Sequence, residues 1–507
     1  MKIKLIFFLL FFESIFFRCF AQTFFNKRID GHNWTYPGTS IIRIDDGSLM
    51  IASQYAVVKT DSLGEFVWAR DYDVSISYRK LIKGENNYIY VGSTSNDGVL
   101  LSKIDTAGNL YWTKAYNLGS SALPDLFYDM IMNNDASIIM VGSIMNWSIN
   151  LDSVQGYFLM VDTNGNVMHS KTYIDPLSKN SWVYSINRKG SSHYLLSGSN
   201  GIDTSSMQDG LIIEVDSVGN LVSEYSIGTN SNEDIRSVFS DNGDFVFTLI
   251  NRGINLTNDL PILVCLDSAY SLKWEKLYDY SCNGFIFHPL LVGRINHNYL
   301  YNSGQQVGEL DSMGTLLTRN GISSAFPFTY EFLAYCKAGN NIFYTGGEGV
   351  TYDYLLIAKS DSTGYSGCGY VNVAPPCISS VNISVQPLTL FADSLFVDIA
   401  SSNNSYSRPT PNVYINCLST GVNEINSNSI KVYPNPAYDL INVSFDFYSD
   451  QLSLDLKIID NYGQIVYSTF INTSTKCIQL NNLVNGMYNF SFQTKDYIFN
   501  KKIIINR

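Results

Sequence analysis

An aspartate followed three residues later by glycine recurs along the chain, and its carboxylate is the first candidate for chemistry. The copies start at Asp61, Asp105, Asp162, Asp216, Asp267, Asp311 and Asp361. A calcium loop needs several oxygen ligands at fixed offsets, with glycine at the sixth position of an EF-hand. Here glycine stands fourth, and Asp162-Thr163-Asn164-Gly165-Asn166 comes nearest to such a loop. We therefore expect the aspartate to cap its own turn and the glycine to supply a positive φ. In the copy at Asp267, Tyr270 replaces the glycine, which predicts a different turn geometry there.

Other patterns that carry catalysis or bind metals do not occur in the sequence. The five histidines are His32, His169, His193, His288 and His297, and no two have His-x-x-x-His spacing. There is no Cys-x-x-Cys, no Gly-x-Ser-x-Gly turn and no phosphate-binding glycine loop. The adjacent carboxylates Asp45-Asp46 and Glu233-Asp234 are interpreted as solvated turn residues. We accordingly assign no catalytic residue, no metal ligand and no cofactor-binding residue.

The aspartate turns belong to a longer repeat. Successive aspartates lie 44, 57, 54, 51, 44 and 50 residues apart, and further apolar segments such as 49–53 precede each one. Each unit therefore offers four short strands in about fifty residues. Four antiparallel strands repeated seven times are typical of a seven-bladed β-propeller, which we place at residues 22–365. One such unit cannot bury its faces alone, so neighbouring blades must cover them.

The strand after several of the turns carries an aromatic residue, a basic residue and a tyrosine at alternate positions. Clear copies are Trp68-Ala69-Arg70-Asp71-Tyr72, Trp112-Thr113-Lys114-Ala115-Tyr116 and Trp274-Glu275-Lys276-Leu277-Tyr278. We expect these tryptophans to pack between blades. The seventh unit lacks this strand, whereas Phe25-Asn26-Lys27-Arg28-Ile29 repeats the pattern near the start of the chain. Residues 23–30 are therefore predicted to close the last blade as its outermost strand, paired with the segment around 355–359.

The last eighty residues carry a different set of features. They open with Tyr433-Pro434-Asn435-Pro436, continue through a turn at Asp460-Asn461-Tyr462-Gly463-Gln464 and close with Gly486-Met487-Tyr488 and Lys501-Lys502. This order resembles the C-terminal sorting domain of the type IX (Por) secretion system of Bacteroidetes. The resemblance implies a β-sandwich at residues 430–507 and the type IX secretion machinery as a partner. It also implies a sorting-signal motif made of Tyr433, Pro434, Asn435, Pro436, Gly463, Gly486, Tyr488, Lys501 and Lys502. The preceding repeats look like those of secreted propellers in Bacteroidetes surface proteins, which implies an architecture only.

The start of the chain agrees with export. Residues 1–21 combine Lys2 and Lys4, an apolar run at 5–12 and a small residue, Ala21, which is typical of a secretory signal peptide. They predict export to the periplasm, followed by secretion or display at the outer-membrane surface. No later segment approaches 18 consecutive apolar residues, so we predict no transmembrane segment in the mature chain.

Residues 366–420 differ in character from the repeats. We predict a small β-linker module there, followed by a flexible linker at residues 421–429. Cys368, Cys377 and Cys417 lie in this region, and an exported chain can form a disulfide within this trio. The seven cysteines expected in the mature chain leave at least one unpaired.

Composition excludes one class of partner. The chain has 45 Asp and Glu against 33 Lys and Arg, a net charge of −12, and no electrostatic footprint for nucleic acid. We predict an all-β protein in which a seven-bladed β-propeller is followed by a small β-module and a β-sandwich sorting domain. With no catalytic motif, the propeller is interpreted as a non-enzymatic scaffold that binds an extracellular glycan or protein. The alternative is a polysaccharide hydrolase or lyase with its site in the propeller channel. Two or three ionisable residues converging near the axis would favour the enzyme, and an apolar or small polar lining would favour the binder.

Overall fold

The computed structural model describes residues 22–506, with short gaps. These gaps are 32–36, 73–76, 120–123, 147–152, 178–179, 202–207, 230, 242, 253–258, 280–288, 296–297, 304–305, 323–329, 340, 349–353, 362–369, 372–376, 403, 422–429, 446–453, 462–463, 472–474 and 494–497. Within the described residues the regular structure is β-strand, apart from a 3-10 turn, η2 (Glu85–Asn87). The all-β class is as predicted. One compact unit comprises Phe24–Ser419, and another contains Thr420–Arg507.

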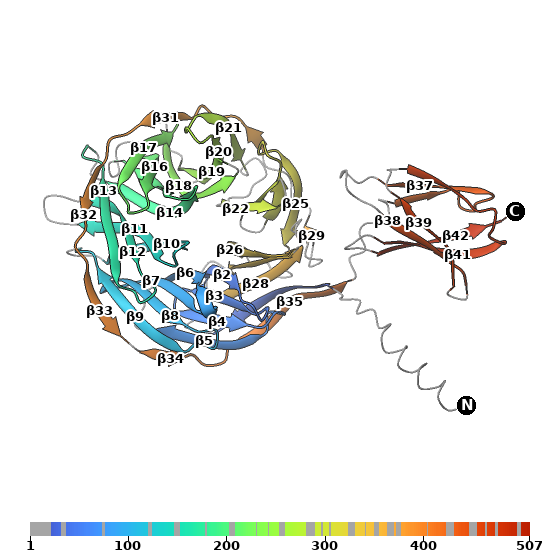
Figure 1. The fold of residues 1–507 in the computed structure, drawn as a ribbon, viewed down its shortest axis with the longest axis horizontal. Coiled ribbons are helices and arrows are strands. Elements are labelled where there is room, and N and C mark those ends of the chain that lie inside the picture. Colours follow the sequence, from blue (N-terminus) through green and yellow to red (C-terminus); the bar gives the residue numbers. More distant parts are fainter. Residues whose placement is uncertain are drawn as a thin grey trace. The chain divides into compact units, whose positions relative to one another are not determined.

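The first unit is a ring of antiparallel sheets (Figure 1), and the described residues contain seven five-stranded ones. In each sheet, four strands follow one another from the innermost strand outward. Sheet 1 holds β2 (Gly38–Arg43), β3 (Leu49–Ser53), β4 (Ala56–Thr60) and β5 (Phe66–Tyr72). Sheet 2 holds β6 (Ser77–Lys83), β7 (Ile89–Ser95), β8 (Gly98–Ile104) and β9 (Leu110–Asn117). Sheet 3 holds β10 (Leu126–Met132), β11 (Ile138–Asn146), β12 (Ser153–Val161) and β13 (Val167–Ile174). Sheet 4 holds β14 (Ser181–Lys189), β15 (His193–Asn200), β16 (Asp209–Asp216) and β17 (Leu221–Gly228).

The remaining three sheets repeat this order. Sheet 5 holds β18 (Asn232–Asp241), β19 (Asp244–Arg252), β20 (Asp259–Leu266) and β21 (Leu272–Asp279). Sheet 6 holds β22 (Pro289–Ile295), β23 (Asn298–Ser303), β24 (Gln306–Leu310) and β25 (Leu316–Ile322). Sheet 7 holds β26 (Tyr330–Ala338), β27 (Asn341–Glu348), β28 (Tyr354–Asp361) and, from the start of the chain, β1 (Gln22–Asp30). The strand order and the ring are those of a β-propeller, in which each sheet is a blade.

The recurrent aspartate caps the turn between the third and fourth strands of a sheet. In the turn at Asp162, one carboxylate oxygen accepts hydrogen bonds from the backbone N–H groups of Asn164 and Asn166, both at 2.8 Å. Burial opposes ionisation there, but these hydrogen bonds outweigh it and lower the pKa of Asp162. The same pair of bonds is present at Asp61, Asp105, Asp216, Asp267 and Asp311. In these six turns, one carboxylate oxygen of the aspartate is therefore used to cap the turn, as predicted.

Tyr270 does not change the turn, contrary to the prediction. It adopts a φ of 62°, and its N–H donates to the carbonyl oxygen of Asp267 at 3.0 Å, as Gly165 does to Asp162 at 2.9 Å. The neighbouring sheet explains why a side chain fits at this position. Sheet 4 has Ser223 and Ile227 where sheets 1, 2 and 5 have tryptophan and tyrosine, so the space that those rings fill there is open to Tyr270. The Tyr270 hydroxyl donates to Glu214 of sheet 4 at 2.7 Å.

In sheets 1, 2, 3 and 5 the tyrosine of the fourth strand bonds the sheet to the next one, and in sheets 1, 2 and 5 a tryptophan packs beside it. The Tyr116 hydroxyl of sheet 2 donates to the Gly165 carbonyl oxygen of sheet 3 at 2.8 Å. Equivalent bonds are Tyr72 to Gly108 at 2.9 Å, Tyr173 to Gly219 at 2.6 Å and Tyr278 to Gly314 at 2.5 Å. A β-carbon on Gly165, whose φ is +75°, would lie 2.9 Å from the Trp112 ring, so only glycine lets this ring approach. Trp68, Trp112 and Trp274 each pack into an apolar cluster shared by two sheets, as predicted.

β1 fastens sheet 7 to sheet 1 in the same way. It pairs antiparallel with β28, with Phe25 opposite Lys359 and Ile29 opposite Leu355. The Phe25 ring lies against the turn of sheet 1, since a β-carbon on Gly64 would be only 2.7 Å from it. The buried Lys27 ammonium lies 2.5 Å from the Glu65 carboxylate of that turn. The predicted partner strand is therefore the one observed, but β1 is not outermost, because another strand lies outside it.

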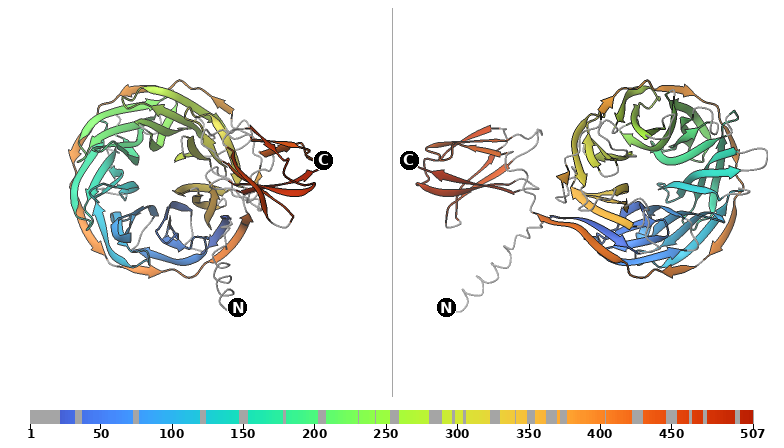
Figure 2. Two further views of the ribbon diagram at one scale, coloured as in Figure 1. Left: turned by 45° about the vertical axis from the view of Figure 1, so that its right-hand side comes forward. Right: turned by 180° about the vertical axis from the view of Figure 1, so that it is seen from behind.

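That outermost strand belongs to a belt, residues 370–421, which adds a fifth strand to all seven sheets (Figures 1 and 2). Its strands are β29 (Tyr370–Val371), β30 (Cys377–Ser379), β31 (Ser384–Pro387), β32 (Phe391–Ser394), β33 (Asp398–Ser402), β34 (Ser405–Ser407) and β35 (Asn412–Gly421). They join sheets 6, 5, 4, 3, 2, 1 and 7 in turn, so the belt runs round the ring in reverse order. Each strand begins seven residues after the previous one, and seven extended residues span at most about 25 Å.

The belt also contributes to the core between the sheets. Leu388 and Leu390 pack with the apolar cluster of sheets 3 and 4, and Leu395 and Val397 with that of sheets 2 and 3. The separate small β-module expected at residues 366–420 is therefore wrong, because these strands pair with the ring instead of with one another. Cys368 and the side chains of Cys377 and Cys417 lie outside the described residues, as do the expected signal peptide at 1–21 and most of the linker at 421–429.

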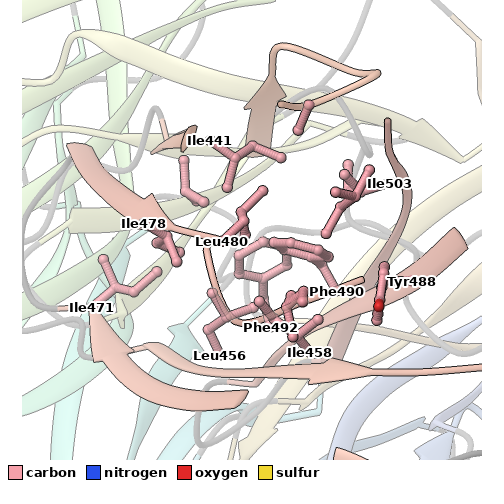
Figure 3. Packing of buried hydrophobic residues seen from close by; sticks show 14 residues of the cluster. Ile441, Leu456, Ile458, Ile471, Ile478, Leu480, Tyr488, Phe490, Phe492 and Ile503 are labelled. Carbon is pink, nitrogen blue, oxygen red and sulfur yellow. The ribbon is translucent and has the colours of Figure 1, made fainter. Parts of the chain in front are cut away.

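The second unit is a β-sandwich. One sheet contains β36 (Ile430–Tyr433), β37 (Leu440–Phe445) and β40 (Thr475–Gln479) in this order. The other has the order β39 (Ile465–Ile471), β38 (Leu454–Ile459), β41 (Gly486–Gln493) and β42 (Ile498–Ile505). Apolar side chains from both sheets, among them Ile441, Leu456 and Phe490, form one buried cluster between them (Figure 3).

Candidate functional site

The innermost strand of every sheet contains a β-bulge at the same place. The extra residues are Thr39, Arg79, Tyr128, Tyr184, Arg236, Val292 and Leu333, in β2, β6, β10, β14, β18, β22 and β26. A bulge breaks the alternation of a strand and re-aims the side chain that it inserts, and bulges are frequent beside functional sites. The seven bulges therefore form a ring of positions around the centre of the propeller, where the innermost strands lie (Figure 1).

Four consecutive bulge residues, Arg79, Tyr128, Tyr184 and Arg236, contact one another across sheets 2 to 5; we call them the axial arc. The Arg79 guanidinium lies over the Tyr128 ring, 5.4 Å from its centroid. The Tyr128 and Tyr184 rings meet edge to face, with centroids 5.0 Å apart. Arg236 lies over the other tyrosine, 4.8 Å from the Tyr184 centroid. All four side chains are partly exposed, so the arc is a cationic and aromatic surface within reach of solvent.

The two arginines of the arc differ in their partners. Arg236 is 2.8 Å from Asp234, whose side chain is 1% exposed. Arg79 makes no ion pair and donates no hydrogen bond to another described residue, and its Nε is buried without a partner. A guanidinium is always charged and always a donor, so Arg79 retains unused donors.

The tyrosine hydroxyls of the arc are also donors. Burial raises the pKa of Tyr128, although the positive charges of Arg79 and Arg236 oppose this. Burial likewise raises the pKa of Tyr184. Both hydroxyls therefore remain protonated at neutral pH. Tyr184 accepts a hydrogen bond of 3.3 Å from Ser199, which leaves its own proton available.

Salt bridges and hydrogen bonds hold the strands of the arc in position. Lys80, next to Arg79, lies 2.8 Å from Asp129, next to Tyr128. The other carboxylate oxygen of Asp129 accepts a hydrogen bond of 3.2 Å from the backbone N–H of Ile186 in sheet 4. One buried aspartate thus links the innermost strands of sheets 2, 3 and 4, which fixes the spacing of the arc.

The pair Glu233-Asp234 is not a solvated turn, contrary to the prediction. Both residues belong to β18 and each is 1% exposed. Glu233 accepts hydrogen bonds from Thr229 and, at 2.9 Å, from Asn251. Burial is the largest cause that raises the pKa of Glu233 to about 7, repulsion by Asp209 and Asp234 adds to it, and the Thr229 hydrogen bonds partly offset it. Asp45 and Asp46 do lie exposed in a turn. Among the described residues, no group of three or more histidines, cysteines or acidic residues is placed to hold a metal ion.

The predicted sorting-signal residues lie in the second unit, and the structure brings several of them together. Asn435 donates to the backbone oxygen of Lys502 at 3.1 Å and accepts from the N–H of Ile504 at 2.9 Å. Tyr433, Pro434 and Pro436 are exposed beside it, as is Lys502. The turn that contains Asn435 is therefore attached to the last strand of the chain.

The other predicted sorting-signal residues stand close in the same sheet. Gly486 begins β41, which pairs with β42, the strand of Lys501 and Lys502. Tyr488 is buried and its hydroxyl donates to the Val484 carbonyl oxygen at 2.8 Å. Gly463 lies outside the described residues.

Two solved structures illustrate what the chain resembles in fold. A catalytically inactive virginiamycin B lyase from Staphylococcus aureus, solved with quinupristin, is 11% identical with a TM-score of 0.47; the match covers 66% of this chain and 99% of the lyase. The extracellular domain of a putative hybrid two-component system from B. thetaiotaomicron is 10% identical with a TM-score of 0.43, covering 94% of this chain and 58% of that one. At these identities and scores, neither likeness bears on what the ring binds. No curated protein matches the sequence.

The C-terminal unit has a clear relative in sequence. Residues 431–506 match the family model of the secretion system C-terminal sorting domain. This domain implies secretion and cell-surface localisation in Bacteroidetes, with the type IX machinery as partner. Within the described residues, no helix has the length and apolar character needed to cross a membrane. The C-terminal β-sandwich of this propeller protein is therefore a sorting domain of the type IX (Por) secretion system.

Proposed function

We propose that the ring is a non-enzymatic binding scaffold that acts outside the cell, with the axial arc as its ligand site. The observation that carries this proposal is Arg79, a partly exposed cation that stacks on Tyr128 and has no carboxylate partner among the described residues. A buried donor without a partner, such as the Nε of Arg79, is costly unless a ligand completes it. The bulges and the Lys80–Asp129 link hold this group in place before any ligand arrives.

Ionisable residues do gather on the innermost strands, and such a cluster near the axis was expected to favour an enzyme. Their acids, however, are occupied: Asp129 pairs with Lys80 and Asp234 with Arg236. Glu233 has a pKa suited to proton transfer but is 1% exposed, so a substrate does not reach it. Arginine is a poor acid or base, because its pKa lies above about 12. The arc therefore favours binding over a hydrolase or lyase reaction.

The test of binding is a screen of the full mature chain on an array of glycans and extracellular matrix proteins. Retention of a ligand without change in its mass supports a scaffold. Release of shortened oligosaccharides from a retained polysaccharide would instead establish the hydrolase or lyase.

For export, we propose that residues 1–21 direct the chain to the periplasm and that the motif around Asn435 and Lys502 is read by the secretion machinery. The proposal on the sorting motif is supported by the exposed turn of Asn435, which is bonded to β42. Residues 421–507 fused to an unrelated periplasmic reporter should carry it to the surface in a host with this system. A reporter that stays in the periplasm would contradict the proposal.

A further inference from the structure

The axial arc offers hydrogen-bond donors in excess of acceptors. The Arg79 guanidinium accepts nothing, and the Tyr128 and Tyr184 hydroxyls donate to no other described residue. We propose that the axial arc binds the carboxylate group of an acidic sugar, with Arg79 as the direct partner of that carboxylate. This inference rests on the proposed binding function and narrows it to one class of ligand.

The choice of a carboxylate follows from the geometry of Arg79. A guanidinium presents parallel N–H groups that match the two oxygens of a carboxylate, and such paired bonds are among the strongest in proteins. Arg236 already bonds a carboxylate, that of Asp234 in its own strand, at 2.8 Å, whereas Arg79 has no carboxylate partner among the described residues. The chain has a net charge of −12, so Arg79 is a local feature and not part of a broad cationic surface.

The choice of a sugar follows from the aromatic rings of the axial arc and from Trp182 next to them. Trp182 and Tyr184 are stacked, with centroids 6.1 Å apart and an interplanar angle of 23°, and Tyr128 meets Tyr184 edge to face. Flat aromatic surfaces bury the C–H faces of a sugar ring, while nearby hydroxyls bond its oxygens. The Tyr184 hydroxyl belongs to a chain of hydrogen bonds, in which Gln208 donates to Ser199 at 2.7 Å and Ser199 donates to Tyr184.

The experiment measures binding of the full mature chain by calorimetry to three oligosaccharides of equal length: a galacturonate trimer, its methyl ester and a galactose trimer. The acidic trimer should bind about 10–100-fold more tightly than the methyl ester, since one charged hydrogen-bonded pair is lost. Its affinity should fall as salt rises, because the interaction is partly exposed.

Variants test the assignment to Arg79. Arg79→Gln should weaken binding of the acidic trimer by about 10–100-fold. Tyr128→Phe, which removes one hydroxyl and keeps the ring, should weaken binding of the acidic trimer by a smaller factor. This variant tests the site independently if Arg79→Gln does not fold. The matched control is Arg188→Gln in β14, since Arg188 also lies over a tyrosine ring, that of Tyr194 at 5.9 Å, but bonds the Met132 carbonyl oxygen at 2.6 Å.

Several outcomes would overturn the inference. Equal affinity for the acid and its methyl ester would show that the carboxylate is not the group recognised. Equal affinity for a glutamate tripeptide would show that the site does not require a sugar. No binding of the acidic trimer, or an unchanged affinity in both arc variants, would also contradict it. In each case a neutral glycan or a protein retained on the array would leave the scaffold function standing, whereas an array without any retained ligand would contradict that function itself.

Discussion

The hydroxyl of Tyr116 in β9 donates a hydrogen bond of 2.8 Å to the carbonyl oxygen of Gly165, in the turn of the next sheet. Tyr116 is fully buried, and the two residues are 49 positions apart in the chain, about one repeat. The bond joins the two most regular features of the sequence, the tyrosine of one outer strand and the aspartate turn of the next. The recurrent motif thus joins the fourth strand of one sheet to the turn of the next sheet.

Tyr116→Phe should lower the free energy of unfolding by about 1–3 kcal/mol, because it leaves the buried Gly165 oxygen without its donor. Thermal and denaturant unfolding measure the change. Tyr406→Phe is the control, since Tyr406 is 53% exposed on the belt. Equal stability of the two variants would show that the fastening bond contributes nothing.

At the junction between sheets 4 and 5, the large residue Tyr270 and the small residue Ser223 should be exchangeable for a small and a large one, respectively. Tyr270→Gly should destabilise by about 3–5 kcal/mol, because a buried ring is removed and a cavity remains. Ser223→Trp alone should also destabilise, since the ring of Tyr270 occupies the space. The double variant should recover part of the loss, because it restores the contact of tryptophan on glycine that Trp68, Trp112 and Trp274 make at their junctions. Strictly additive changes in unfolding free energy would contradict this account.

The spacing of aspartate, glycine, tryptophan and tyrosine was sufficient to predict the all-β repeats and the pairing of β1 with β28. The belt escaped this reasoning because β29 to β34 have only two to five residues each and pair with strands far away in sequence. Alternation within so few residues is no signal of a strand. A period of seven residues was nevertheless present: Val381 and Ile383 are followed seven positions later by Leu388 and Leu390, and then by Leu395 and Val397.

The axial arc was missed for another reason. A bulge is a property of two paired strands, so Arg79 and Tyr128 look like ordinary exposed strand residues when each segment is considered alone. Glu233 was misplaced in a turn because two adjacent acids are usually solvated. Its hydrogen bonds come from Thr229 and Asn251, and the second of these lies in another strand.

If the belt is part of the ring, a substitution in it should destabilise the ring itself. Leu390→Ala should cost about 2–5 kcal/mol, because Leu390 is 4% exposed and packs between sheets 3 and 4. The neighbouring Phe391→Ala should cost little, since Phe391 is 57% exposed. Tryptophan fluorescence reports unfolding of the ring in both variants. An unchanged ring transition in Leu390→Ala would mean that the belt does not support the ring.

Glu233 should make the protein less stable as the pH rises. Its folded pKa of about 7 lies above the ordinary value of 4.5, so the native state holds this proton more tightly than the unfolded chain does. The contribution of neutral Glu233 is therefore complete below pH 4.5 and is lost as the pH rises through 7. Glu233→Gln should raise the melting temperature relative to the parent at pH 8 and not at pH 4.5. Glu275→Gln, on β21 of the same sheet, controls for the loss of one carboxylate. A gain at pH 8 that equals the gain at pH 4.5 would contradict the raised pKa.

If the exported ring binds its ligand at the innermost strands of sheets 2 to 5, the ligand should protect these strands from hydrogen exchange. The measurement compares the mature chain with and without a ligand retained on the array. The ligand should slow exchange in peptides that contain Arg79, Tyr128, Tyr184 and Arg236, with no change in the belt. Protection confined to the belt or to the outer strands, with these four peptides unchanged, would contradict it.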